Sequence, residues 1–145
     1  MCISYDIDCD PRSLARQTVV QFLHQFAVQN SRSLDQVDLF LSEFAPHPQS
    51  RPLARQWILG TWQHLEQIDQ LICQASTNWE PSRISLVDRN NLRLAIYQLL
   101  YCHEIPPKVV INEAIELARL FSTAQAPAFI NGVLDAIYHK IKEES

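Results

Sequence analysis

The chain has 145 residues, of which 47% are hydrophobic and 19% charged, and its formal net charge is −4 at pH 7. This length and composition predict one soluble globular domain with a substantial core. Two glycines are too few for a turn-rich β-sandwich or a glycine-rich phosphate loop. The sequence shows neither a secretory signal nor an apolar run long enough for a membrane span.

The N-terminal part predicts a tail followed by an amphipathic helix. Residues 1–9 lack helical periodicity, and we expect them to form a flexible tail. Asp10 supplies a side chain that can cap free helix amides, and Pro11 is already constrained to a helical backbone angle. One apolar stripe follows at helical spacing, formed by Ala15, Val19, Phe22, Leu23 and Phe26.

Two further helical regions are predicted before residue 76. Ser33 opens a capping-box pattern for a short helix that ends near Phe44. The prolines at 46, 48 and 52 then interrupt the chain, because proline inside a helix removes a hydrogen bond. A long helical region is predicted over 52–75, and Gly60 within it marks a close contact or a bend.

Three helices are predicted in the second half. A cap pattern at 85–88 opens a helix over 86–102 that is apolar on nearly every side, which predicts a central position. Pro107 or Lys108 begins the next helix, and a break at 122–127 precedes the last one. We expect a single all-α domain over 10–145, with an N-terminal bundle at about 10–76 and a C-terminal bundle at about 82–143.

The sequence offers few candidates for catalysis or metal binding. The four cysteines include no CxxC pair, and the five histidines are scattered. Glu113 and Glu116 share one helix face, which is typical of a solvated flank, whereas Cys102 and His103 point about 100° apart on a helix. We therefore expect no enzyme activity, no metal, no cofactor, and reduced thiols in a cytoplasmic protein.

The distribution of charge is more informative than the net charge. From Pro11 to Leu34, and again from Ala45 to Leu65, the chain has arginines but no acid. Arg12 and Arg16 are four residues apart and share a helix face. Such guanidinium groups bind RNA phosphates, but placement on ordinary solvated helix faces explains the same pattern.

Three segments carry a family pattern: LRLAIYQL at 92–99, INEAIELARLF at 111–121 and FINGVLDAI at 129–137. In this order and spacing, the chain resembles the NusB family of transcription antitermination factors from about Arg12 to Ile141. The resemblance implies a NusB-like fold of two packed three-helix bundles. It also implies an RNA-binding adaptor rather than an enzyme.

The resemblance assigns candidate RNA contacts at two places. The segment PRSLAR stands where the family has an arginine-rich RRxAR start, so Arg12 and Arg16 match, while Ser13 falls where a further arginine is frequent. Phe129 of FINGVLD is implied at the RNA surface, although it is also compatible with the core. Gln125 stands where the family often has an acid, and losing that charge favours phosphate binding.

A partner surface is implied as well. His24 stands where the family often has tyrosine in its contact with NusE, which is also a ribosomal protein. Asp88 matches an acidic position of that interface, and a helix-capping role is compatible with the same residue. Asn131 and Asp135 are expected to form structural hydrogen bonds, and Gly132 is expected to permit a close helix crossing.

The resemblance therefore predicts an adaptor that binds a single-stranded leader element of ribosomal RNA transcripts, together with NusE, on the RNA polymerase elongation complex. One alternative is an accessory domain of the kind found in a ribosomal RNA cytosine methyltransferase, although 145 residues leave no space for a cofactor-binding domain. Another alternative is a helical scaffold without RNA binding, which the negative net charge favours.

Overall fold

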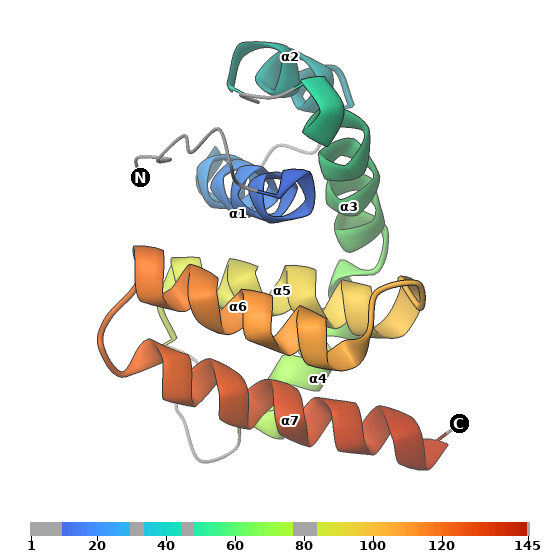
Figure 1. Ribbon diagram of the computed structural model, residues 1–145, viewed down its shortest axis with the longest axis vertical. Coiled ribbons are helices and arrows are strands. Elements are labelled where there is room, and N and C mark those ends of the chain that lie inside the picture. Colours follow the sequence, from blue (N-terminus) through green and yellow to red (C-terminus); the bar gives the residue numbers. More distant parts are fainter. Residues whose placement is uncertain (1–9, 30–33, 45–47, 77–83, 145) are drawn as a thin grey trace. The chain divides into compact units, whose positions relative to one another are not determined.

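The computed structural model describes residues 10–29, 34–44, 48–76 and 84–144 (Figure 1). Within these ranges the chain forms seven α-helices, one 3-10 turn and no strand, which confirms the all-α prediction. The chain divides into two compact units, Met1–Gln63 and His64–Ser145. The predicted tail at 1–9 and the capping residue Ser33 lie outside the described residues.

The first unit is built around its N-terminal helix. It contains α1 (Pro11–Gln29), α2 (Leu34–Phe44), the 3-10 turn η1 (Pro48–Ser50) and α3 (Arg51–Gln63). The Asp10 carboxylate accepts a hydrogen bond from the backbone N–H of Arg12 at 2.9 Å, which confirms the predicted helix start. α1 packs against α2, η1 and α3, and all five residues of its predicted stripe are buried.

Aromatic rings form the core of the first unit. The Phe22 ring stacks on Phe26 with centroids 4.4 Å apart, and meets Phe40 edge-on at 5.2 Å. It also lies 5.0 Å from the ring of Trp62. These rings come from α1, α2 and α3, so one cluster joins the three helices. Offset and edge-on ring pairs are favourable beyond the area they bury.

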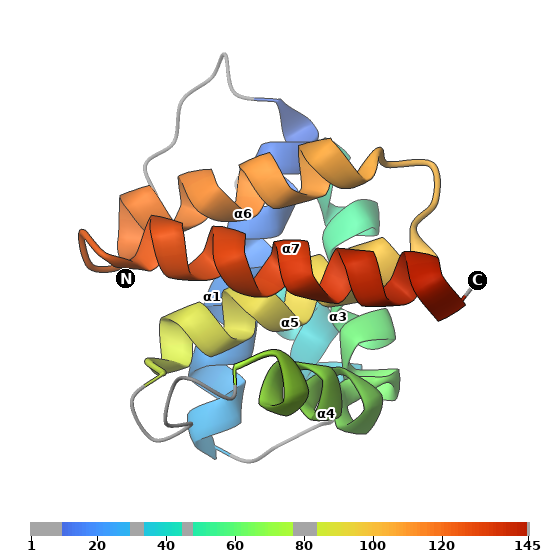
Figure 2. The ribbon, with the colours of Figure 1, turned by 90° about the horizontal axis from the view of Figure 1, so that it is seen from below.

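In the second unit, α5 holds the central position that its all-round apolar pattern predicts. The unit contains α4 (Leu65–Ala75), α5 (Leu86–Tyr101), α6 (Pro107–Phe121) and α7 (Ala126–Glu144). α5 contacts the other three helices, and α4 also packs against α7. α6 and α7 run antiparallel side by side, as two perpendicular views show (Figures 1 and 2).

Hydrogen bonds fix α5 to its neighbours. The buried Asn91 donates its amide N–H to the backbone carbonyl of Ala114 on α6 at 2.8 Å. The Arg93 guanidinium donates to both carboxylate oxygens of Asp69 on α4, at 2.8 and 3.0 Å. It also donates to the side-chain oxygen of Asn90 at 3.0 Å. These hydrogen bonds are directional, so they fix the positions of α4 and α6 against α5. Apolar contacts are not directional and do not fix these positions by themselves.

Most helix starts of the second unit follow the sequence signals. The Ser85 hydroxyl accepts the backbone N–H of Asp88 at 3.1 Å, and the extended backbone of Ser85 is that of an N-cap residue. α6 begins at Pro107, and its cap residue is Pro106. α7 begins at Ala126, one residue before Pro127, within the predicted break.

The long helical region predicted over 52–75 is two helices, and the predicted boundary at 76–82 differs from the structure. His64 lies between α3 and α4 with φ −111° and ψ 19°, outside helical values, and its ring stacks on Tyr101 at 4.0 Å. Because α4 packs against α5 and α7, it groups with the second unit, which begins at His64.

The close helix crossing expected at Gly132 of α7 is wrong. A Cβ at Gly132 would meet nothing within 4 Å, because the residue lies on the exposed side of α7 and none of the described helices crosses there. Asn131 and Asp135 are exposed as well. The Asp135 carboxylate lies 3.6 Å from His139 Nδ1, one turn along the same helix, so it binds no other element through this contact.

The Arg93 pair predicts a measurable contribution to stability. Arg93→Ala removes a bidentate ion pair whose arginine side chain is only 13% exposed, and it leaves Asp69 and Asn90 with fewer partners. We expect the free energy of unfolding to fall by about 2 kcal/mol in urea denaturation.

Arg55→Ala is the matched control, because Arg55 pairs with Asp38 at 2.8 Å while both side chains are about half exposed. Its loss should cost less than about 1 kcal/mol. Equal losses in the two variants would show that the Arg93 pair contributes no more than an ordinary surface pair.

Candidate functional site

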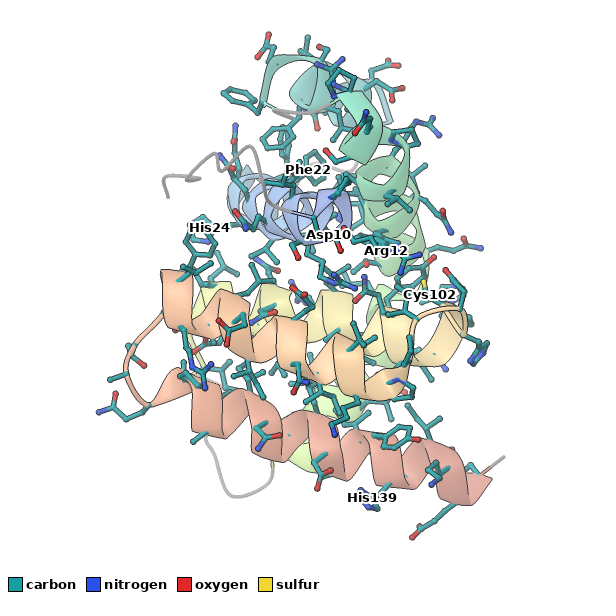
Figure 3. All side chains as sticks on the ribbon, viewed as in Figure 1. Asp10, Arg12, Phe22, His24, Cys102 and His139 are labelled. Carbon is teal, nitrogen blue, oxygen red and sulfur yellow. The ribbon has the colours of Figure 1, made fainter. Side chains whose placement is uncertain are left out.

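Arg12 is exposed in the first turn of α1. Arg12 lies two residues after Asp10, whose carboxylate caps the helix. Both residues are labelled in Figure 3, as is His24, which lies later in α1. A cation at a helix N-terminus gains nothing from the helix dipole, which favours negative charge there. The fold therefore gives this arginine no electrostatic stabilisation from the helix, and its charge is accessible to an anionic ligand.

Arg16 stands one turn later in a different environment. It is 3% exposed, and its guanidinium lies 5.3 Å from the ring centre of Trp57, which is also buried. A guanidinium over an indole face is a favourable cation–π contact. The four-residue spacing places Arg12 and Arg16 on the same side of α1. Arg16 can contact a phosphate only if its guanidinium moves away from the Trp57 ring.

His24 is half buried on α1, toward the C-terminal end of the helix. Its Nδ1 atom is buried and has no hydrogen-bond partner among the described residues. An imidazole nitrogen without a partner loses the hydrogen bond that water would give it. This atom is therefore removed from water without compensation among the described residues, and only part of the His24 side chain is accessible.

Asp88 lies in the first turn of α5, where a carboxylate is favoured by the free amides and the helix dipole. The residue is 7% exposed, and its Oδ1 atom is buried with no hydrogen-bond partner among the described residues. The cap itself is Ser85, so the side chain of Asp88 is not needed to close the helix. An unpaired carboxylate oxygen is a costly feature that a cationic partner would offset.

Gln125 and Phe129 come together at the start of α7. The backbone N–H of Phe129 donates to the carbonyl of Gln125 at 3.3 Å. Gln125 is exposed, Phe129 is half buried, and Ile130 next to it is fully buried. Phe129 thus precedes the buried Ile130 by one position, and part of its side chain is accessible.

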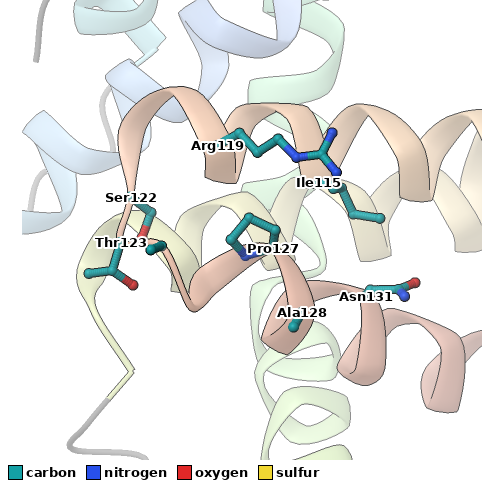
Figure 4. Close-up of a pocket in the computed structure, with 8 residues that line it drawn as sticks. Ile115, Arg119, Ser122, Thr123, Pro127, Ala128 and Asn131 are labelled. Carbon is teal, nitrogen blue, oxygen red and sulfur yellow. The ribbon is translucent and has the colours of Figure 1, made fainter.

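A pocket of about 670 Å³ opens between the end of α6 and the start of α7 (Figure 4). The lining residues come from both helices and the loop between them: Ile115, Arg119, Ser122, Thr123, Ala124, Pro127, Ala128 and Asn131. Sequence reasoning missed this pocket. Its signal in the sequence is the stretch at 122–128, in which five of seven residues are Ser, Thr or Ala and leave space between two packed helices.

The described residues add little that points to other chemistry. They contain no cluster of three His, Cys, Asp or Glu side chains placed to hold a metal. Cys73 on α4 is an exposed free thiol and Cys102 a buried one, while Cys2 and Cys9 lie outside the described ranges. None of the helices in those ranges is long and apolar enough to cross a bilayer.

Comparison with known proteins gives one consistent family. The family model described as "NusB family" matches residues 13–139. "Transcription antitermination protein NusB" of Syntrophus aciditrophicus is 37% identical over 92% of this chain and 83% of its own length. Among solved structures, T. maritima NusB superposes with a TM-score of 0.79 at 36% identity, covering 94% of this chain and 99% of that one.

A further structure supports the fold alone. It is described as antitermination factors NusB and NusE in complex with dsRNA, and it superposes with a TM-score of 0.79 at 24% identity, covering 90% of this chain and 97% of that one. The family match begins within α1 and ends within α7, so it includes at least part of every described helix. The helix order, the FINGVLD segment at the start of α7 and these matches agree, and the chain belongs to the NusB family.

Proposed function

We propose that this protein is an RNA-binding transcription antitermination adaptor. It binds a single-stranded leader element of ribosomal RNA transcripts jointly with NusE, on the RNA polymerase elongation complex in the cytoplasm. The observation that carries this proposal is the match to the NusB family over residues 13–139. The exposed Arg12, and Gln125 with the half-buried Phe129, are the RNA contacts we assign.

The adaptor acts by binding and catalyses no reaction. Each of its contacts is weak by itself, because a single phosphate contact or a stacked base contributes little affinity. Linking RNA and NusE on one protein makes the second binding step effectively intramolecular, which raises the overall affinity without any new contact. A protein with a net charge of −4 gains useful RNA affinity in this way.

For contacts with NusE we assign two residues, each considered within its own unit: His24 in the first unit and Asp88 in the second. Asp88 places a largely buried carboxylate, 7% exposed, at the start of α5, and its Oδ1 atom has no hydrogen-bond partner among the described residues. Ribosomal proteins are generally basic, so an arginine or lysine of NusE is a suitable counter-ion. Such complementary charges act on association rate and specificity more than on affinity.

The first test measures RNA binding and its salt dependence. Fluorescence anisotropy with a short single-stranded leader RNA should show weak binding by this protein alone and tighter binding when NusE is added. Arg12→Ala should flatten the slope of log K against log salt by about 0.7 units, the value for one phosphate contact to a single strand.

Arg16→Ala serves as the internal comparison. Because the Arg16 guanidinium is stacked on Trp57, its removal should change the salt slope less than that of Arg12 and should lower the melting temperature. Binding that does not depend on salt, or no gain from NusE, would contradict the proposed function. A matched double-stranded RNA tests the preference for a single strand.

The Phe129 ring is expected to stack on a base. Phe129→Ala should weaken RNA binding by about 1–3 kcal/mol while the salt slope stays nearly constant, because no charge is removed. Its stability loss should be smaller than the about 3–5 kcal/mol typical of a core phenylalanine, since the residue is only half buried.

Tyr138→Ala is the matched control, a half-buried aromatic on the same helix that carries no assigned RNA contact. Melting curves and RNA titrations on the same samples separate the two roles of Phe129. A large stability loss with unaltered affinity of the folded protein would place the ring in the core.

The Asp88 carboxylate is expected to contribute to NusE pairing through its charge. Asp88→Asn keeps the size of the side chain and the Ser85 cap, so the fold should be retained. Pairing with NusE, measured by biolayer interferometry, should show a slower association rate, and the difference from wild type should shrink at high salt. Asp135→Asn, an exposed acid of α7, is the control. The assignment fails if both variants pair with NusE like the wild type.

A further inference from the structure

We propose that the pocket between α6 and α7 receives one unstacked nucleotide of the bound RNA. This inference rests on the proposed function and names a binding site within it. The pocket, of about 670 Å³, is of the size of small-molecule sites in proteins. Single-stranded RNA is recognised by bases that leave the stack and insert into such sites.

The charge of the lining suits an anionic ligand. Among the lining residues Arg119 is a cation and none is acidic, although the whole chain has 16 acids and 12 basic residues. Arg119 forms an ion pair with Glu116, three residues earlier on α6, and both side chains are about 60% exposed. Exposed pairs of this kind contribute little, so the guanidinium can exchange Glu116 for a phosphate or the face of a base.

The polar groups and the floor suit a base. Asn131 is exposed on α7 and lines the pocket, and its amide offers both a donor and an acceptor to a base edge. The hydroxyl of Thr123 lies at the loop side, where a ribose or phosphate oxygen is a suitable partner. Pro127 and Ala128 give a small apolar surface against which a flat ring can pack.

The pocket residues are close in sequence to Gln125 and Phe129, the RNA contacts assigned in this part of the chain. The pocket nevertheless lies on a different side of α7 from Phe129. Asn131 follows Phe129 by two residues, which corresponds to about 200° around the helix. One base cannot contact both side chains, so a strand passing the start of α7 uses Phe129 for one nucleotide and the pocket for another. A Cβ at Gly132 would meet nothing within 4 Å, so the surface beside Asn131 is open.

The experiment uses the full chain with NusE and a short single-stranded leader RNA. Asn131→Ala should raise the Kd about tenfold, the effect of losing one hydrogen-bonded base contact. Asn112→Ala, which removes the same side chain from an exposed position of α6 outside the pocket lining, should change the Kd less than about twofold. Melting curves should be alike for both variants because both side chains are exposed.

Abasic substitution along the RNA then locates the nucleotide. At one RNA position, removal of the base should weaken binding by the wild type. The same removal should not further weaken binding by Asn131→Ala. This RNA position should differ from the one at which Phe129→Ala shows the same behaviour. Non-additivity of this kind is the signature of a direct contact.

The outcomes separate the two levels of the proposal. If the wild type binds the RNA and Phe129→Ala weakens it while Asn131→Ala binds like wild type, the pocket assignment is overturned and the adaptor function stands. Additive losses at every abasic position also overturn the pocket. A loss of NusE pairing by Asn131→Ala without RNA would assign the pocket to a protein contact and overturn it. No RNA binding by the wild type with NusE would overturn the function itself.

Discussion

The second unit depends on burying a helix that is apolar on almost every side. α5 contacts α4, α6 and α7, so its burial is possible only when all three are in place. Apolar packing alone permits several rotations of such a helix. The bond from Asn91 to the carbonyl of Ala114 and the bidentate pair of Arg93 with Asp69 select one of them. The position of α6, and through it the pocket beside α7, follows from that choice.

The same residue type serves different purposes according to what surrounds it. Arg93 joins two helices, and Arg16 covers a tryptophan ring. Arg12 is exposed in the first turn of α1. Arg119 lines the pocket and forms an exposed ion pair with Glu116, which contact with water weakens. A count of arginines therefore overstates the charge available for RNA. Of these four arginines, Arg12 and Arg119 are exposed, and sharing the RNA with a protein partner compensates for weak individual contacts.

Local signals in the sequence predicted most of the fold. Asp10, Ser85 and Pro107 mark helix starts through capping and restricted backbone angles, and the structure has helices beginning beside each. The apolar stripe of α1 predicted which side of that helix is buried, because helical spacing is regular. The break at His64 was not predictable from these signals, since the chain there has no proline and the apolar pattern runs on through it.

The candidate site was less predictable because its properties arise from contacts distant in sequence. The burial of Arg16 depends on Trp57, forty-one residues away. The pocket depends on how small side chains of two antiparallel helices meet, which no single segment shows. Gly132 was interpreted as a packing residue because a mid-helix glycine costs stability, and its open surroundings show that packing is not the reason it is tolerated.

The order of the helices around α5 also affects the chain during its synthesis. α4 leaves the ribosome before α5, but α6 and α7 follow it. At about 5–20 residues per second, the sides of α5 that α6 and α7 later cover stay uncovered for roughly 2–10 seconds. During that interval Asn91 also lacks its partner Ala114, so a nascent chain paused within α6 exposes apolar and polar groups that only the complete chain can satisfy. The central helix can therefore stabilise the second unit only after the last helix, α7, has been made.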